Sequence, residues 1–299
     1  MPVLKLEAKP APVGDFTVLR VIPQRALRFV GPFCFLDHMG PHTSIGVVDG
    51  GVAPHPHIGL ATVTYLFDGA ILHRDSLGTE QLITPGDVNW MTAGRGIVHS
   101  ERTPPSLIGK SSTMHGLQFW VALPIKSADE SAGAMDHEEG PPSFQHAPRS
   151  SLPFEKKDGV SLRVVLGEWK KQRSPVKIAS PLTLVVAELD AGAELELDPL
   201  HPERALYVAE GNVTLDAESL SRGEVASLVP GEAHTVTAIT PAKVAFMAGA
   251  ALDGPRSLLW NFVSSRRELL NKAKEDWIAG RFPNVPGDAG PRVPWPESK

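Results

Sequence analysis

The most regular feature of the chain is a series of short apolar runs separated by turns rich in proline and glycine. Four of these runs are Ala61–Phe67, Leu117–Leu123, Leu162–Leu166 and Leu182–Leu189. Runs of this length and spacing are typical of short strands in a β-sandwich or β-barrel. We therefore predict an all-β protein built mainly from antiparallel strands.

One segment near the C-terminus departs from this pattern. Its apolar residues lie near helical spacing, at Leu258, Trp260, Phe262, Leu269, Leu270, Ala273 and Trp277. Charged residues fill the other faces, as in an amphipathic helix. Gly280, which Phe282-Pro283 follows closely, is a typical helix end. We expect Ser257–Ala279 to form the one substantial α-helix.

A segment with few apolar residues divides the chain near its middle. Asp129–Pro153 contains Gly140-Pro141-Pro142 and Ser150-Ser151, a composition that favours an exposed linker. A length of 299 residues also suits two domains. We predict an N-terminal barrel at residues 1–135, a linker at 136–155, a C-terminal barrel at 156–256, and a helix and tail at 257–299.

The two halves also share a turn motif. Thr84-Pro85-Gly86-Asp87 follows a strand-like run in the first half, and Val229-Pro230-Gly231-Glu232 follows one in the second. Repetition of such a unit favours a duplicated barrel.

Composition and charge exclude several classes of protein. Hydrophobic residues make up 42% of the chain and charged residues 21%, so it should bury a core. The net charge is -5 and no block of Lys and Arg is present, so we expect no direct binding of nucleic acid.

Lys5, Glu7, Lys9 and Asp15 interrupt the first apolar stretch, which argues against a secretory signal, and no later run has the length of a membrane span. The single cysteine, Cys34, fits a reducing compartment, so we expect a cytoplasmic protein.

Two pairs of polar residues carry the candidate chemistry. His55 and His57 are two residues apart, and His99 and Glu101 repeat this spacing. Because alternate side chains of a strand project from the same face, two adjacent strands could aim all four groups at one point. Either pair alone would more often be a polar strand face.

Three imidazoles and a carboxylate suit a borderline transition metal. Iron, manganese, nickel, copper and zinc accept such ligands, whereas calcium and magnesium prefer oxygen. With octahedral geometry, two positions would stay open, and a structural metal usually has a closed set of ligands instead. We expect His55, His57, His99 and Glu101 to bind one metal ion, with Fe(2+) favoured and Ni, Cu, Mn or Zn possible.

Longer motifs around these residues resemble the pirin family, and they cover most of the chain. The matching segments are 54–57, 67–69, 73–78 and 85–101 around the paired residues, and 31–38, 114–121, 260–263 and 280–283 elsewhere. The resemblance implies a bicupin, with two antiparallel β-barrels of the cupin type. It also implies that His55, His57, His99 and Glu101 are the metal ligands, with the acidic ligand supplied by the second strand.

The second barrel contains residues that resemble a metal site that has lost part of its ligand set. His201 and His234 could occupy the first and last ligand positions, but Glu203 stands where a second histidine would be. We do not expect it to bind metal, although a residual ligand role stays open.

Other residues of the first half could lie near the metal or only complete turns and the core. The histidines of this kind are His38, His42, His73 and His115, and the larger apolar residues are Phe33, Trp90, Met114, Phe119 and Trp120. Asp37, Asp75 and Arg95 could likewise only fix loops.

An open iron site with these ligands favours ring-cleaving dioxygenation, because a chelating oxygen and dioxygen can bind side by side. The pirin resemblance implies a quercetin 2,3-dioxygenase-like activity, with a flavonol and O2 as substrates and Glu101 accepting the substrate's hydroxyl proton. The alternative is a metal-dependent binding protein that acts on a transcription regulator or metabolic enzyme. We expect a monomer, although the sequence does not fix the oligomeric state.

Overall fold

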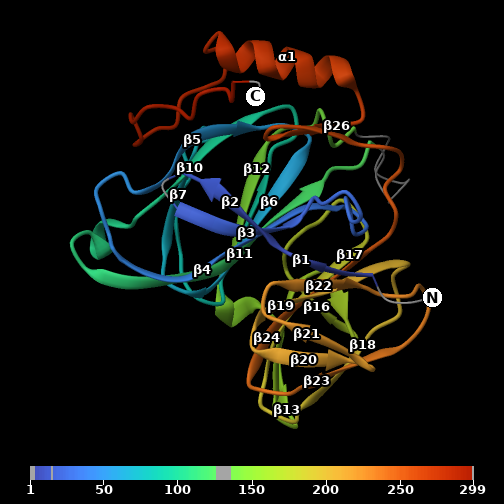
Figure 1. The fold of residues 1–299 in the computed structure, drawn as a ribbon. Helices are drawn as coiled ribbons and strands as arrows, with labels where there is room; N and C mark the ends of the chain where they lie inside the picture. Colours follow the sequence, from blue (N-terminus) through green and yellow to red (C-terminus); the bar gives the residue numbers. More distant parts are fainter. Residues whose placement is uncertain (1–3, 15, 126–135, 298–299) are drawn as a thin grey trace. The chain divides into compact units, whose positions relative to one another are not determined.

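The fold is seen in a computed structural model that describes residues 4–14, 16–125 and 136–297 (Figure 1). The chain divides into two compact units, and each is assembled from separate stretches of sequence. The first, here the histidine unit, comprises Ala11–Val18, Met39–His146 and Asp253–Lys299. The second, here the companion unit, comprises Met1–Pro10, Leu19–His38 and Ala147–Leu252.

The histidine unit contains two β-sheets. In sheet order, the larger has β12 (Ser143–Ala147), β9 (Val88–Thr92), β6 (Leu60–Asp68), β11 (Ser111–Ala122), β4 (Phe33–Ile45), β3 (Phe16–Ile22) and β2 (Lys9–Val13). The smaller has β5 (Gly51–His57), β10 (Ile97–Arg102), β7 (Ile71–Asp75) and β8 (Glu80–Ile83). Strands β2, β3 and β4 also contain residues of the companion unit. A short 3-10 helix, Pro105–Leu107, precedes β11.

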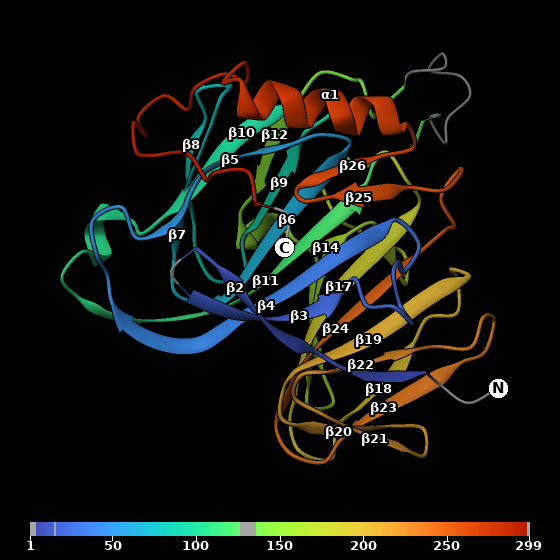
Figure 2. The same ribbon diagram turned by 45° about the horizontal axis from the view of Figure 1, so that its top comes forward.

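The C-terminal segment completes the histidine unit with a small hairpin and the helix. The hairpin pairs β25 (Ser257–Leu259) with β26 (Phe262–Ser264), and α1 spans Arg267–Ile278. The apolar face of α1 packs against Ile58, Val98 and Phe262. Figures 1 and 2 both show α1 lying over β26 and beside β5.

The helix predicted at Ser257–Ala279 is therefore correct only from Arg267 onward, over the 12 residues of α1 and at its end. Its first part is wrong, because residues 257–264 form the hairpin. Trp260 adopts a positive φ of 54° at the turn, and Phe262 and Val263 are fully buried. Gly280, with a φ of 70°, follows the helix as predicted.

The companion unit repeats the arrangement of two sheets. Its larger sheet has β1 (Lys5–Glu7), β22 (Glu224–Ser227), β19 (Glu203–Glu210), β24 (Ala242–Gly249), β17 (Leu182–Leu189), β14 (Val160–Leu166) and β13 (Phe154–Lys157). Its smaller sheet has β18 (Glu194–Leu197), β23 (His234–Ala238), β20 (Asn212–Leu215) and β21 (Glu218–Ser221). The 3-10 helix Arg149–Ser151 and the hairpin of β15 (Glu168–Trp169) with β16 (Gln172–Arg173) lie outside these sheets.

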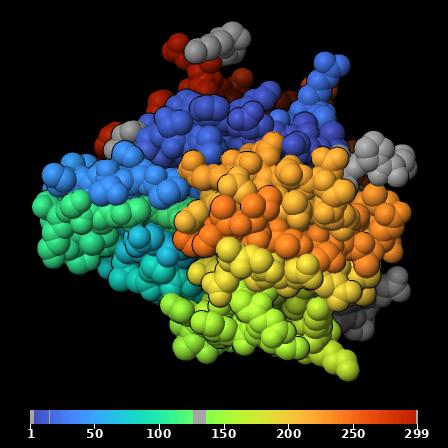
Figure 3. Space-filling view, turned by 60° about the horizontal axis from the view of Figure 1, so that its bottom comes forward, coloured from blue at the N-terminus to red at the C-terminus, as the bar shows by residue number. Residues whose placement is uncertain are grey.

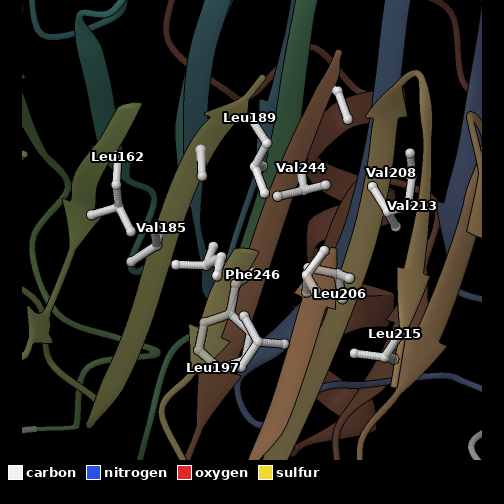
Figure 4. Packing of buried hydrophobic residues seen from close by; sticks show 14 of the residues in the cluster. Leu162, Val185, Leu189, Leu197, Leu206, Val208, Val213, Leu215, Val244 and Phe246 are labelled. Carbon is white, nitrogen blue, oxygen red and sulfur yellow. The ribbon is translucent and has the colours of Figure 1, made fainter. Parts of the chain in front are cut away.

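A continuous apolar core holds the companion unit together. Figure 4 shows side chains such as Leu162, Leu206 and Phe246 gathered at its centre, and each is buried. They come from alternate positions on the strands, because side chains of a strand project in turn to opposite faces. Figure 3 shows a face of the molecule on which this unit reaches the surface, in yellow-green to orange.

The predicted all-β bicupin with one C-terminal helix is confirmed, with the difference that each unit is formed by two facing sheets and not by a closed barrel. The repeated turn is also present in both units. Asp87 N donates to Thr84 O at 3.0 Å, and Glu232 N donates to Val229 O at 3.4 Å. Gly86 and Gly231 both have a positive φ there.

The segment expected to be an exposed linker differs from that expectation in two places. Residues 129–135 lie outside the described residues, but Glu138 is buried and β12 joins the larger sheet of the histidine unit. No helix among the described residues is long and apolar enough to cross a membrane.

Candidate metal centre

The two predicted ligand pairs lie on neighbouring strands of the smaller sheet of the histidine unit. Strand β10 pairs antiparallel with β5, so that His99 lies opposite His55 and Ile97 opposite His57. Pro54 and Pro56 are tolerated within β5 because it is the edge strand of that sheet. The prediction that two adjacent strands carry the pairs is confirmed.

The three histidines converge on one point. Each offers a ring nitrogen, and these nitrogens all lie within 4.8 Å of one another. The Nε2 atoms of His57 and His99 are 3.1 Å apart. All three side chains are buried, with exposed fractions of 7% or less. This is the one such group of three or more candidate ligands among the residues that the structure describes.

The opposite ring nitrogens are held by other groups. Nδ1 of His55 lies 2.8 Å from Ala53 O, and Nδ1 of His57 lies 3.0 Å from Asn261 O. A carbonyl oxygen only accepts hydrogen bonds, so both Nδ1 atoms carry the proton and both Nε2 atoms keep a free lone pair. Metal-bound histidines are commonly fixed in this way. The residues therefore fit a transition metal held through Nε2.

Burial keeps these imidazoles neutral. Burial, with smaller contributions from His73 and Arg102, lowers the pKa of His55 to about 4, although the hydrogen bond to Ala53 opposes that change. Burial and nearby imidazoles also lower the pKa values of His57 and His99 well below the usual range. A histidine must be neutral to bind a metal, so the three are ready to do so at neutral pH.

Glu101, two residues after His99 on β10, is not part of this group. A β-bulge between His99 and Glu101 shifts the register, so that Glu101 lies opposite Val52. The Thr64 hydroxyl donates to Glu101 Oε1 at 3.3 Å. Burial raises the pKa of Glu101, while His73 and the hydrogen bonds of Thr64 and Gln118 partly oppose that rise.

His73 and Asp75 on strand β7 form a second group behind His99. His73 Nδ1 lies 3.5 Å from His99 Nδ1, and His73 Nε2 lies 3.2 Å from Asp75 Oδ2. Phe144 stacks on the His73 ring at 4.6 Å between centroids. From the sequence alone, the roles of His73 and Asp75 stay open, although their i, i+2 spacing repeats that of the ligand pairs.

The Asn261 carbonyl was not predicted, and an ion pair buried in the same unit fixes the segment that carries it. Arg256 Nε lies 2.5 Å from Glu138 Oε1, and both side chains are almost wholly buried. Glu138 also accepts hydrogen bonds from Ser264 Oγ at 2.9 Å and from Ser265 N at 3.0 Å. These contacts hold the β25–β26 hairpin against residues 136–139.

The remaining predicted neighbours divide into those near the site and those away from it. Trp120 contacts the His57 ring edge-on, with 5.1 Å between centroids. His115 contacts Phe67, and His42 is exposed. Three more are fixed elsewhere: His38 Nδ1 lies 2.7 Å from the Tyr207 hydroxyl, Asp37 pairs with Arg20, and Trp90 donates to Thr92. Phe33 and Phe119 are fully buried core residues, Met114 packs at the edge of an apolar cluster, and the Arg95 backbone N–H binds Gly140 O.

The candidate ligands of the companion unit are engaged by other groups. His201 Nε2 lies 3.2 Å from the Thr183 hydroxyl, and Glu203 accepts a hydrogen bond from Gly31 N at 2.7 Å. His234 Nδ1 lies 2.6 Å from Asp216 Oδ2. They do not form a group of three among the described residues.

Comparison with known families covers most of the chain. The family described as Pirin matches residues 15–121, and the family described as Pirin C-terminal cupin domain matches residues 184–283. A Pirin-like protein of Caulobacter vibrioides is 42% identical, over 98% of this chain and 99% of its own length. A protein of Pseudomonas aeruginosa that is provisionally named quercetin 2,3-dioxygenase is 36% identical, over 94% of this chain and 87% of its own.

Solved structures agree with this assignment. A quercetin 2,3-dioxygenase from Acinetobacter baumannii matches with a TM-score of 0.86 and 32% identity, over 99% of this chain and 96% of that one. A bacterial pirin from Escherichia coli, solved in complex with nickel(II), matches with a TM-score of 0.64 over 84% of this chain and 100% of that one. Its identity of 18% makes it evidence for the fold alone. The extent of these matches, together with the convergent histidines, shows that the chain belongs to the pirin family.

Proposed function

We propose that this protein is an iron-dependent dioxygenase that cleaves the heterocyclic ring of a flavonol such as quercetin. The observation that carries the proposal is the convergence of ring nitrogens of His55, His57 and His99 within 4.8 Å, with Glu101 two residues after His99 on the same strand. Relatives and a similar solved structure named as quercetin 2,3-dioxygenases support the substrate class.

Within this proposal, the chain's residues have distinct roles. His55, His57 and His99 hold the metal, and Glu101 is a further ligand that also accepts the proton of the substrate hydroxyl. A bound ferrous ion would supply a Lewis acid and an electron source for dioxygen. Trp120, in contact with His57, helps to exclude water from that side.

The first test compares the wild type with His57→Ala. Both are purified without oxygen, loaded with ferrous iron and assayed for metal content and for turnover of quercetin in air. We expect about one iron per chain and turnover in the wild type, and loss of both in the variant. His42→Ala, which changes an exposed histidine, should behave as the wild type. Iron bound without turnover of any flavonol would contradict the dioxygenase and favour a metal-dependent binding protein.

A second test separates the two roles of Glu101. Glu101→Gln keeps the size of the side chain but removes its charge. If it retains iron and loses turnover, the proton-acceptor role is supported. Full turnover with full iron content would show that role to be wrong, and loss of iron would leave ligation as the explanation.

We further expect iron as the bound metal over nickel, copper, manganese or zinc, a monomer and a cytoplasmic location. Metal analysis of protein taken from its native cell, together with size-exclusion chromatography coupled to light scattering, would test the first two.

A further inference from the structure

A chain of three buried side chains leads away from the metal centre on one side. Asp75 Oδ2 lies 3.2 Å from His73 Nε2, and His73 Nδ1 lies 3.5 Å from His99 Nδ1. Strand β7 brings them together, because it pairs with β10 in the sheet that carries the ligands. The exposed fractions of His73, Asp75 and His99 are 3%, 0% and 1%, so water does not compete for these contacts.

The positions of the protons on His73 and His99 follow from the groups around them that can only accept a hydrogen bond. An ionised carboxylate accepts, so His73 donates to Asp75 from Nε2 and keeps a lone pair on Nδ1. His99 must then donate from its own Nδ1 to that lone pair. Its Nε2 is left without a proton and faces the Nε2 of His57 at 3.1 Å.

We propose that His73, held by Asp75, is a positioning residue that fixes the tautomer of His99 for metal binding. This inference rests on the metal centre of the proposed function, but it does not depend on dioxygenation.

His99 needs such a device more than the other two ligands do. His55 and His57 donate to the carbonyl oxygens of Ala53 and Asn261, which can only accept. His99 instead meets another imidazole, which can act as donor or acceptor. Asp75 removes that ambiguity, since it accepts from one nitrogen of His73 and so makes the other an acceptor.

An asparagine at position 75 would not accept the hydrogen bond from His73 as Asp75 does. Asp75 Oδ1 accepts from Leu77 N at 2.8 Å and from Thr79 N at 3.1 Å. In Asp75→Asn, these two donors would hold the amide oxygen, so the amide NH2 would face His73. His73 would then donate from Nδ1 toward His99, whose proton would move to Nε2 and block the metal.

The experiment measures Ni(II) affinity of the metal-free full chain by competition with a chelator. We expect Asp75→Asn to bind Ni(II) about 10 to 100 times more weakly than the wild type. Asp87→Asn is the matched control, because Asp87 caps a turn in the same unit by accepting from Thr84. It should leave the affinity unchanged.

A double variant separates a change in the tautomer of His99 from a general disturbance of the structure around residue 75. His73→Phe retains a ring to stack on Phe144 but removes the link between residue 75 and His99. If the chain works as proposed, Asp75→Asn adds no further loss in the presence of His73→Phe. Additive losses in the double variant would overturn the proposal.

Nitrogen NMR of labelled histidines in the metal-free protein gives a direct readout. We expect His99 to carry its proton on Nδ1 in the wild type and on Nε2 in Asp75→Asn. A proton on Nε2 in the wild type, or Ni(II) binding by Asp75→Asn as tight as in the wild type, would overturn the inference. A wild type that binds no Ni(II) would refute the metal centre of the proposed function instead, and an absence of quercetin turnover would refute only the reaction.

Discussion

At the scale of single residues, the proposed metal centre would depend on groups of two kinds. His55, His57 and His99 would bind the ion through their side chains, whereas Asn261 contributes its backbone carbonyl, 3.0 Å from His57 Nδ1. Any residue carries a carbonyl at that point, provided that the backbone keeps its path. The site is therefore sensitive to the path of residues 260–262 and insensitive to the side chain at 261.

We predict that Asn261→Ala retains the Ni(II) affinity of the wild type within about twofold, because the carbonyl that orients His57 is unchanged. Chelator competition on the full chain measures this. A loss beyond tenfold would mean that the amide side chain itself supports the site.

The spacing of residues explains why the convergence of His55, His57 and His99 was predictable and the Asn261 contact was not. Two residues at i and i+2 on a strand share a face, which is a local rule and needs no knowledge of the fold. A backbone acceptor has no signature in the sequence, and Asn261 meets His57 only through the long return of the chain. The burial of Glu138 was missed for the same reason, since its partner Arg256 is far away in sequence.

At the scale of elements, the β25–β26 hairpin connects the core to the metal centre. Its strands are only three residues long and Trp260 lies at the turn between them, so neither strand is long enough to outweigh the helical spacing of the apolar residues that follow. The buried pair of Arg256 with Glu138 fixes the start of this hairpin, and the two serines bonded to Glu138 fix its end.

We predict that Arg256→Met lowers the free energy of unfolding by about 3–5 kcal/mol, because it removes the buried cation of Glu138 and leaves that carboxylate only the longer contact with Arg266 at 3.5 Å. Urea unfolding monitored by tryptophan fluorescence measures the change. Lys272→Ala, which removes an exposed ion pair of α1, should cost under about 0.5 kcal/mol. Equal effects of the two substitutions would contradict the importance of burial.

At the scale of the whole molecule, the two units are built from similar sheets but differ in the polar residues that they bring together. The histidine unit gathers three neutral imidazoles, whereas the companion unit uses its counterpart, His234, in a pair with Asp216. The general architecture was predictable from the repeated turn and strand pattern. The assembly of each unit from separate stretches was not, because it depends on which distant strands pair.

We predict that the His234–Asp216 pair makes the stability of the companion unit depend on pH. Burial alone would raise the pKa of Asp216, but hydrogen bonds from Thr235 N and His234 outweigh it and lower the pKa below its usual 3.8. The ionised carboxylate therefore stabilises the fold above about pH 4, and this is lost as the pH falls through the folded value. Asp216→Asn should lower the melting temperature at pH 7, with a gap to the wild type that closes below about pH 4.

Differential scanning calorimetry across that range measures the gap. Glu218→Gln, at an exposed carboxylate in the same unit, should show almost no gap at any pH. A difference between Asp216→Asn and the wild type that persists undiminished in acid would show that the charge is not the cause.

The late position of Asn261 in the chain has a consequence for synthesis in the cell. His55, His57 and His99 leave the ribosome long before residues 253–299, which complete their unit. Until then His57 lacks the carbonyl that orients it, so a nascent chain would hold metal weakly and exchange it freely. The choice of metal should therefore be made after translation. It should then depend on the cellular supply of each ion, and not on which ion the chain met first during elongation.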